Sequence, residues 1–324
     1  MQSESRSVKW DNLKFVLIFF VVFGHILFPF RNESYLVRGF YLFIYSFHMP
    51  LFIFVSGLFS KTIIRKRQWH RVFSYLVLYV FIRTLDMLGT YMQRGILRLN
   101  YFKTNGPDWY ALAVFLFLVV TIMMQNCNPG ILILISVAIG LTAGLGDNLG
   151  SIFASMRSCV FYPFFLLGFY ADRKRLESFR GRKVRIAAGV VLTLIVCFFV
   201  IKGSDYFELV NLLKGKKTYD ALHLTALEGV LLRGLQYLAA LIISALMILA
   251  IPSAKNVFTG IGKNTLPIFA WHYLFIKLFL AVSGKKAVLK LFPETYILIL
   301  LCLCMALIFF CSSRIFERTK AIMV

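Results

Sequence analysis

The strongest constraint on the fold is a series of apolar runs, each about 20 residues long, that recurs along the whole chain. Short polar links separate these runs, and none of the links is long enough to form a soluble domain of its own. Hydrophobic residues occupy 60% of the 324 positions and charged residues only 15%. Soluble domains have about 45–50% apolar and about 25% charged residues. We therefore expect an all-α, polytopic integral membrane protein with one domain over residues 1–324.

The apolar runs predict about ten transmembrane helices. A run of this length without charges satisfies its own backbone only as a helix inside lipid. The expected spans cover residues 12–30, 40–59, 72–92, 109–125, 130–146, 152–170, 184–201, 227–251, 265–283 and 295–312.

The net charge of +22 has a membrane explanation. Cytoplasmic loops of membrane proteins are rich in Lys and Arg and contact anionic lipid, so nucleic acid is not an expected partner. The links on the side of the N-terminus carry more Lys and Arg than the others, which predicts cytosolic termini. The six cysteines lie in or beside apolar runs without the paired spacing of metal ligands. We therefore expect no metal site.

Ionisable groups inside lipid cost at least about 2.5 kcal/mol each, so they usually face a polar cavity. On the first span, Lys14 and His25 are separated by eleven positions. On a helix they point about 20° apart and lie about 16 Å apart along the axis. Asp11 lies one turn below Lys14, so the three form a polar stripe. His25 alone exchanges a proton readily near neutral pH. A structural histidine that bonds a neighbouring helix is an equally good interpretation.

On the second span, Tyr41, Tyr45, His48 and Phe52 share one helical face. Pro50 lies within the span and should kink it. A histidine beside a kink is a candidate for the wall of a site, and packing is the alternative.

The segment 61–71 is strongly basic and is expected at the cytosolic surface. Arg65 and Arg71 there suit lipid phosphates or a phosphorylated cytosolic ligand. A plain topology signal is the alternative.

Two pairs of charges lie deep in other spans. Arg83 and Asp86 are three residues apart, so they are expected to neutralise each other. Glu228 and Arg233 are five apart and point in different directions, so each is expected to pair with another helix.

Five segments together resemble the acyltransferase-3 family of membrane acyltransferases, especially its fucose-4-O-acetylase-like branch. In chain order these segments read DNLKFVLIFFVVFGH, YSFHMPLFIFVSG, WYALAVFLF, FYPFFLLGFYAD and GKNTLPIFAWHYL. Each segment alone is weak evidence, but five in this order are fairly specific. The resemblance covers nearly the whole chain.

The resemblance implies a membrane protein of about ten helices that moves an acyl group, usually acetyl, from cytosolic acetyl-CoA to a sugar hydroxyl. The family places a basic residue on the first helix, then a histidine after ten intervening residues, and this pattern falls on Lys14 and His25. Many members have arginine at the first position. An Arg-x-x-Arg pair often follows the second helix; here Gln68 stands three before Arg71, and Arg67 stands four before it.

From the resemblance, His25 is expected to be the general base and His48 to stabilise the oxyanion of acyl transfer. The phosphates of coenzyme A are assigned to Lys14, Arg65 and Arg71. The expected activity is O-acetylation of a carbohydrate, either a surface polysaccharide or its lipid-linked precursor, in the bacterial cytoplasmic membrane. A small-solute or glycan transporter is the rival interpretation, and a non-catalytic membrane scaffold is a third.

Overall fold

The computed structural model describes residues 7–97, 99–104, 106–146, 153–179, 181–292 and 295–323. Across these ranges the chain forms helices and no β-strand, in agreement with the all-α prediction. The long helices are α1 (Val8–Leu27), α2 (Tyr35–Phe59), α4 (Trp69–Arg94), α5 (Asp108–Met124), α6 (Pro129–Thr142), α7 (Ser155–Tyr170), α9 (Arg182–Lys202), α11 (Ala226–Ala250), α13 (Thr265–Ser283) and α15 (Tyr296–Cys311).

Short helices connect or extend the long ones. They are η1 (Phe28–Phe30), α3 (Lys61–Arg65), α8 (Arg173–Ser178), η2 (Phe207–Leu209), α10 (Val210–Leu213), η3 (Asp220–Leu222), α12 (Thr259–Gly262), α14 (Lys285–Leu291) and η4 (Arg314–Met323).

Each predicted span overlaps one long helix, although the predicted start of the sixth span, Ile152, lies outside the described residues. In the described chain six helices are long and apolar enough to cross a membrane: α1 with η1, α2, α4, α9, α11 and α13. α15 and η4 add a seventh if this pair, bent by 67°, is one span. The protein is therefore a candidate multi-pass membrane protein. Ten spans stay a prediction, because α6 has only 14 residues and a span needs about 20.

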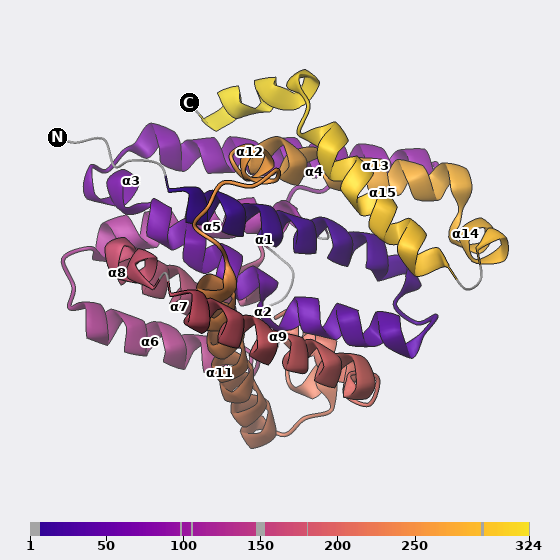
Figure 1. Cartoon of the computed structure of the whole chain (residues 1–324). Coiled ribbons are helices and arrows are strands. Elements are labelled where there is room, and N and C mark those ends of the chain that lie inside the picture. The colour runs from indigo at the N-terminus through magenta and orange to yellow at the C-terminus, as the bar shows by residue number, and fades with distance from the viewer. Residues whose placement is uncertain are drawn as a thin grey trace.

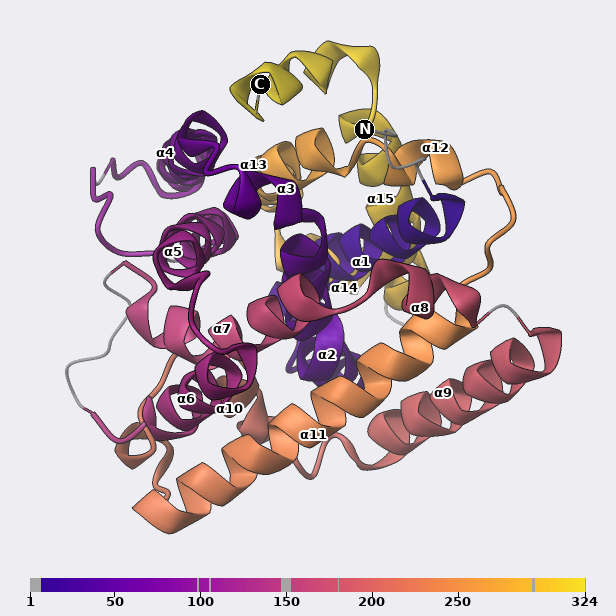
Figure 2. The same cartoon turned by 90° about the vertical axis from the view of Figure 1, so that its left-hand side faces the viewer.

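Helix α2 lies at the centre of the bundle (Figures 1 and 2), where it packs against α1, α7, α9 and α11. Of its most apolar stretch 67% is buried, compared with 11% for α9. Helix α1 packs against α2 on one side and against α12, α13 and α15 on the other. The two helices that carry the predicted histidines are therefore interior.

A close helix crossing joins α2 and α7 through two glycines. A Cβ added at Gly57 would lie 2.0 Å from the carbonyl oxygen of Phe165, and one at Gly168 would lie 1.9 Å from that of Phe54. Real Cβ atoms do not approach backbone so closely, so the crossing requires glycine on both helices. Small residues allow the same backbone approach in membrane helix pairs generally.

The N-terminal turn of α1 is anchored by polar bonds. Asn12 donates from Nδ2 to the carbonyl oxygens of Pro252 (2.9 Å) and Ala254 (3.0 Å), and it accepts from Thr259 Oγ1 at 2.7 Å. Trp10 Nε1 donates to the carboxylate of Glu177 at 2.7 Å. These bonds fix the rotation of α1 and therefore the direction in which Lys14 and His25 point.

The structure confirms the predictions for Arg83, Asp86 and Arg233 but not the prediction for Glu228. Arg83 Nη1 lies 2.7 Å from Asp86 Oδ2, which confirms the expected pair. Arg233 is fully buried and donates to the carbonyl oxygen of Leu212 on α10 at 2.6 Å, so it does reach another element. The prediction for Glu228 is wrong. Glu228 instead caps its own helix, because its carboxylate accepts from the backbone N–H of Thr225 at 2.9 Å.

The start of α1 and the end of η4 lie toward the same end of the bundle (Figure 1). We call this the Lys14 end, and the opposite end, where α1 runs into η1, the His25 end. Shared placement of the two termini agrees with an even number of crossings.

Candidate active site

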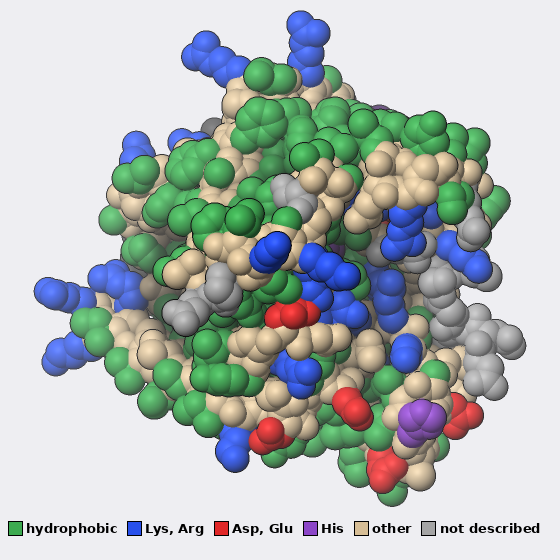
Figure 3. Space-filling model, turned by 90° about the vertical axis from the view of Figure 1, so that its right-hand side faces the viewer, with side chains coloured by type: hydrophobic (Ala, Val, Ile, Leu, Met, Phe, Trp, Pro, Cys, Tyr) green, Lys and Arg blue, Asp and Glu red, His purple; other side chains and the backbone are tan. Residues whose placement is uncertain are grey.

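Two cavities open at the His25 end, and His25 and Tyr273 line both of them. The first cavity has a volume of about 510 Å³ and is bounded by α1, α2, α5, α7 and the α10 segment. The second has about 630 Å³ and lies between α1, α4 and α13. Volumes of this size suit small-molecule ligands. Figure 3 shows the face at this end, with a hollow ringed by Lys and Arg side chains.

The His25 imidazole stands at the wall shared by the two cavities. Its ring centroid lies 4.9 Å from that of Tyr273, edge to face, and 5.3 Å from that of His272. No hydrogen bond from a described residue reaches its ring nitrogens, and the side chain is only partly buried. These nitrogens are therefore available to a ligand, as a general base requires.

His48 and His272 hold one tautomer each. His48 Nδ1 lies 2.6 Å from the carbonyl oxygen of Ile44, and His272 Nδ1 lies 3.0 and 2.9 Å from those of Ile268 and Phe269. A carbonyl oxygen only accepts, so Nδ1 carries the hydrogen in both rings and Nε2 is left as an acceptor. A neutral His48 in this tautomer accepts a proton at Nε2, and its predicted oxyanion role requires the imidazolium.

The face of α2 that was predicted to be a wall divides between two cavities. Tyr41, Tyr45 and His48 line the first cavity, whereas Phe52 lines a cavity at the Lys14 end. The rings of Tyr41 and Tyr45 lie 4.4 Å apart. Pro50 lies within α2, which remains helical on both sides of it.

The second cavity is held together by an ion cluster. Lys277 on α13 pairs with the carboxylate of Asp86 on α4 and donates to Thr90 Oγ1 at 2.7 Å. Asp86 also pairs with Arg83, so its carboxylate is already engaged. Tyr273 is one turn before Lys277 on the same helix. The cluster therefore locks α13 against α4 and fixes Tyr273 beside His25.

Lys14 lines a separate cavity of about 230 Å³ at its own end, which we call the Lys14 cavity. Its Nζ lies 3.9 Å from Asp11 Oδ1 and 4.2 Å from the ring centroid of Phe59. Ser56, Tyr75 and other polar side chains complete this cavity.

Of the residues assigned to coenzyme A, only Lys14 lines the Lys14 cavity. Arg65 at the end of α3 and Arg71 in the first turn of α4 are both exposed at this end. Arg71 is one turn before Tyr75, which does line the cavity. The structure thus brings the three cations to one end without gathering them in one pocket.

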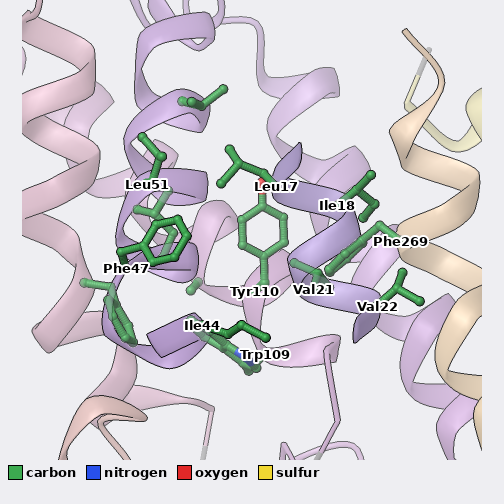
Figure 4. Close-up of a cluster of buried hydrophobic side chains, with 14 of the residues drawn as sticks. Leu17, Ile18, Val21, Val22, Ile44, Phe47, Leu51, Trp109, Tyr110 and Phe269 are labelled. Carbon is green, nitrogen blue, oxygen red and sulfur yellow. The ribbon is translucent and has the colours of Figure 1, made fainter. Parts of the chain in front are cut away.

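An aromatic layer of Phe52, Tyr110 and Phe269 separates the two ends. The ring centroids of Tyr110 lie 5.1 Å from Phe52 and 5.0 Å from Phe269. Tyr110 and Phe269 belong to the buried cluster around α1 in Figure 4. No described residue lines both the Lys14 cavity and a cavity at the His25 end. The polar stripe of α1 therefore faces separate cavities, because rings from α2, α5 and α13 fill the space between them.

The family follows from comparison with known proteins. The family model described as "Acyltransferase domain" (Acyl_transf_3) matches residues 8–316. The chain belongs to the acyltransferase-3 family. Membership supports a membrane protein that transfers acyl groups, and the match includes both ends of the candidate site. No curated protein and no solved structure matches this acyltransferase-3 chain.

In this acyltransferase-3 member, sequence reasoning gave no site role to several residues that line the first cavity. Arg157 on α7 stacks on Trp109 at the start of α5, with its Cζ 4.8 Å from the ring centroid. Tyr273 and Lys214 were also missed. A signal existed for Tyr273, which directly follows His272 in a resembling segment. No signal existed for Lys214, because a short link has no periodicity.

Lys214 is the site residue outside the spans whose ionisation is most perturbed. Burial, and then repulsion from Arg31 and Arg157, lowers the pKa of Lys214 to about 7. Its Nζ lies 4.9 Å from the ring centroids of both Tyr41 and Tyr45. The first cavity therefore concentrates positive charge beside aromatic faces.

Within the described ranges, no group of three or more His, Cys, Asp or Glu side chains is arranged to hold a metal ion. The polar groups that line the two cavities beside His25 are mainly imidazoles, phenols and cations, together with Glu208 and the ion-paired carboxylate of Asp86.

Proposed function

We propose that this protein is a membrane O-acetyltransferase of the fucose-4-O-acetylase-like branch. It transfers acetyl from cytosolic acetyl-CoA to a hydroxyl of a surface polysaccharide or its lipid-linked precursor. The observation that carries the proposal is His25, which no described residue hydrogen-bonds and which stands where two cavities meet. In a family that transfers acyl groups, such a histidine suits the general base.

The proposed reaction begins when His25 takes the proton of the acceptor hydroxyl. The resulting oxygen nucleophile attacks the acetyl carbonyl carbon, and the carbon–sulfur bond then breaks. The coenzyme A thiolate leaves with the bonding electrons and takes up the proton from the His25 imidazolium. A positioned base contributes about 10²–10⁴-fold to such a step. Arg157 in the first cavity is the candidate to stabilise the oxyanion. The same role for His48 stays a prediction, because it requires the imidazolium.

In this proposal the donor occupies the Lys14 end and the acceptor the His25 end. The proposal places the protein in the bacterial cytoplasmic membrane with both termini cytosolic, which puts Lys14 beside the cytosolic pool of acetyl-CoA. The acetyl group then has to cross the aromatic layer over about 16 Å. It travels on the donor itself, whose thioester then reaches His25, or on a group that carries it across. On the second route that group, and not coenzyme A, is the leaving group at His25 and takes up the proton.

Arg71→Ala is expected to raise the KM for acetyl-CoA several-fold and to leave kcat within about twofold. Arg71 is exposed at the Lys14 end, and a phosphate contact made equally in ground and transition states acts on KM alone. The measurement is initial-rate kinetics on the purified protein. Arg94→Ala is the matched control, since Arg94 lies at the other end of the same helix and lines the second cavity. An unchanged KM for Arg71→Ala in folded protein removes Arg71 from the donor site.

The activity itself is tested by thiol release. Purified protein in lipid vesicles receives acetyl-CoA and the glycan fraction of its host, and free thiol and glycan-bound acetyl are measured together. An acetyltransferase yields both in equal amounts, and His25→Gln yields neither. A transporter moves solute without thiol release. A scaffold does neither, and substitution of the α1 stripe has no effect on it.

A further inference from the structure

The wall of the first cavity carries an excess of positive charge. Its four cations come from three separate segments: Arg31 follows η1, Arg157 lies on α7, and Lys214 and Lys216 follow α10. Arg157 is buried, with only 7% of its surface exposed. A buried cation normally has a partner, since its desolvation is expensive.

These cations have little negative charge to balance them inside the described structure. Of the described residues that line the cavity, Glu208 is the one carboxylate, and it is exposed. No described carboxylate lies within 4.0 Å of Arg31, Arg157 or Lys214 as an ion pair. The buried Asp108 acts electrostatically on Arg157, but it does not line the cavity. Arg31 donates to the backbone carbonyl oxygen of Phe28 at 2.6 Å, and this bond leaves its charge uncompensated.

Aromatic rings of the same cavity hold two of these cations in place at its wall. Lys214 Nζ stands over Tyr41 and Tyr45, and Arg157 stands over Trp109. Both cations are thereby held at the wall, with the cavity in front of them. The lowered pKa of Lys214 has the same origin, because burial among cations penalises its charged form. A bound anion would relieve this penalty.

We propose that the first cavity binds an acceptor saccharide that carries an oxyanion, a carboxylate or a phosphate, close to the hydroxyl that is acetylated. Arg31, Lys214 and Lys216 bind the anion, and Arg157 faces it from α7. The rings of Tyr45 and Trp109 pack against the apolar face of the sugar, as aromatic walls do in ligand pockets generally. His25 on the same cavity meets the hydroxyl. This inference rests on the proposed function, and it narrows the acceptor to acidic carbohydrates.

The alternative ligand for these cations is the donor, because its nucleotide is also an anion. Two observations favour the acceptor. The cations lie at the His25 end, whereas Lys14 and Arg71 are at the opposite end, where the termini lie. The aromatic layer separates the two cavities, so one nucleotide cannot contact both sets of cations. The experiment includes the nucleotide as a competitor for this reason.

The test is calorimetric binding of three small saccharides to the purified, full-length protein. Methyl glucuronide and glucose 1-phosphate carry the anion, and methyl glucoside is the neutral match. We expect the better anionic ligand to bind at least about 10-fold tighter than the glucoside. This difference corresponds to about 1.4 kcal/mol, which a hydrogen bond between charged groups can supply. The comparison of the two anions shows whether carboxylate or phosphate is preferred. Binding should weaken with salt.

Lys214→Gln is expected to reduce the preference for the anion to about threefold or less and to leave glucoside binding unchanged. Lys217→Gln is the matched control, because Lys217 is exposed in the same link and does not line the cavity. If Lys214→Gln does not fold, Arg31→Gln replaces it.

Three results overturn the inference: equal binding of glucoside and both anions, no saturable binding of either anion by folded protein, or displacement of the anion by adenosine 3′,5′-bisphosphate. The last would assign the cations to the donor. The readout is binding, so failure of the proposed transfer reaction would appear separately in the thiol assay.

Discussion

His25→Gln is expected to lower kcat by at least about 10²-fold, with the KM for acetyl-CoA nearly unchanged. Glutamine keeps hydrogen-bonding capacity but cannot accept the hydroxyl proton. The effect on folding should be small, because no described residue hydrogen-bonds the His25 ring and the side chain borders two cavities. The measurement is thiol release under saturating acetyl-CoA and acceptor.

The control is the same substitution at His70, which is exposed on α4. His70→Gln should retain full turnover. Near-normal turnover of His25→Gln would instead favour a structural histidine, and the base would then be sought at His48 and His272. Both have an Nε2 acceptor in the tautomer that the structure holds, so each is chemically able to replace it.

Gly168→Ala is expected to have the largest effect on stability. Its Cβ would lie 1.9 Å from the carbonyl oxygen of Phe54, a backbone atom that a rotamer change cannot move. Overpacking of this kind costs about 1–3 kcal/mol and sometimes more, and here it separates α7 from the central helix α2. We expect most of the protein to be lost from the monodisperse fraction in detergent, and the remainder to unfold at a clearly lower Tm.

The matched control is Gly189→Ala on α9, where an added Cβ meets no atom within 4 Å. Alanine is favoured over glycine inside a helix by up to about 1 kcal/mol, so this variant should be as stable as the parent or more so. A Gly168→Ala protein that matches the Gly189→Ala protein in yield and Tm would show that the α2–α7 crossing is looser than described.

The features that could be predicted from the sequence are those that depend on the 3.6-residue period of a helix. The positions of the long helices, the shared direction of Lys14 and His25, and the Arg83–Asp86 pair all follow from local spacing. The separation of the α1 stripe into different cavities does not, because it depends on Phe52 and two rings from distant helices. The packing between helices determines which cavities exist, and the helical period of the sequence does not specify that packing.

Other failures had different causes. Glu228 follows Thr225 by three residues, a capping signal that competes with the expected interhelical pair and prevails because it is local. Lys214 lies in a link whose fold is set by its contacts with α2.

The aromatic layer has a consequence for the energetics of the cell. A protein with polar cavities open at opposite ends of a bundle is a potential leak for protons and ions. The rings of Phe52, Tyr110 and Phe269 lie between those cavities, and no described residue lines a cavity at both ends. Under the proposed function, this layer would let the protein expose its base to one compartment and its donor site to the other while the membrane keeps its electrical potential. Removal of the Phe269 ring would therefore be expected to increase leakage of ions through the protein more than it lowers the rate of acyl transfer.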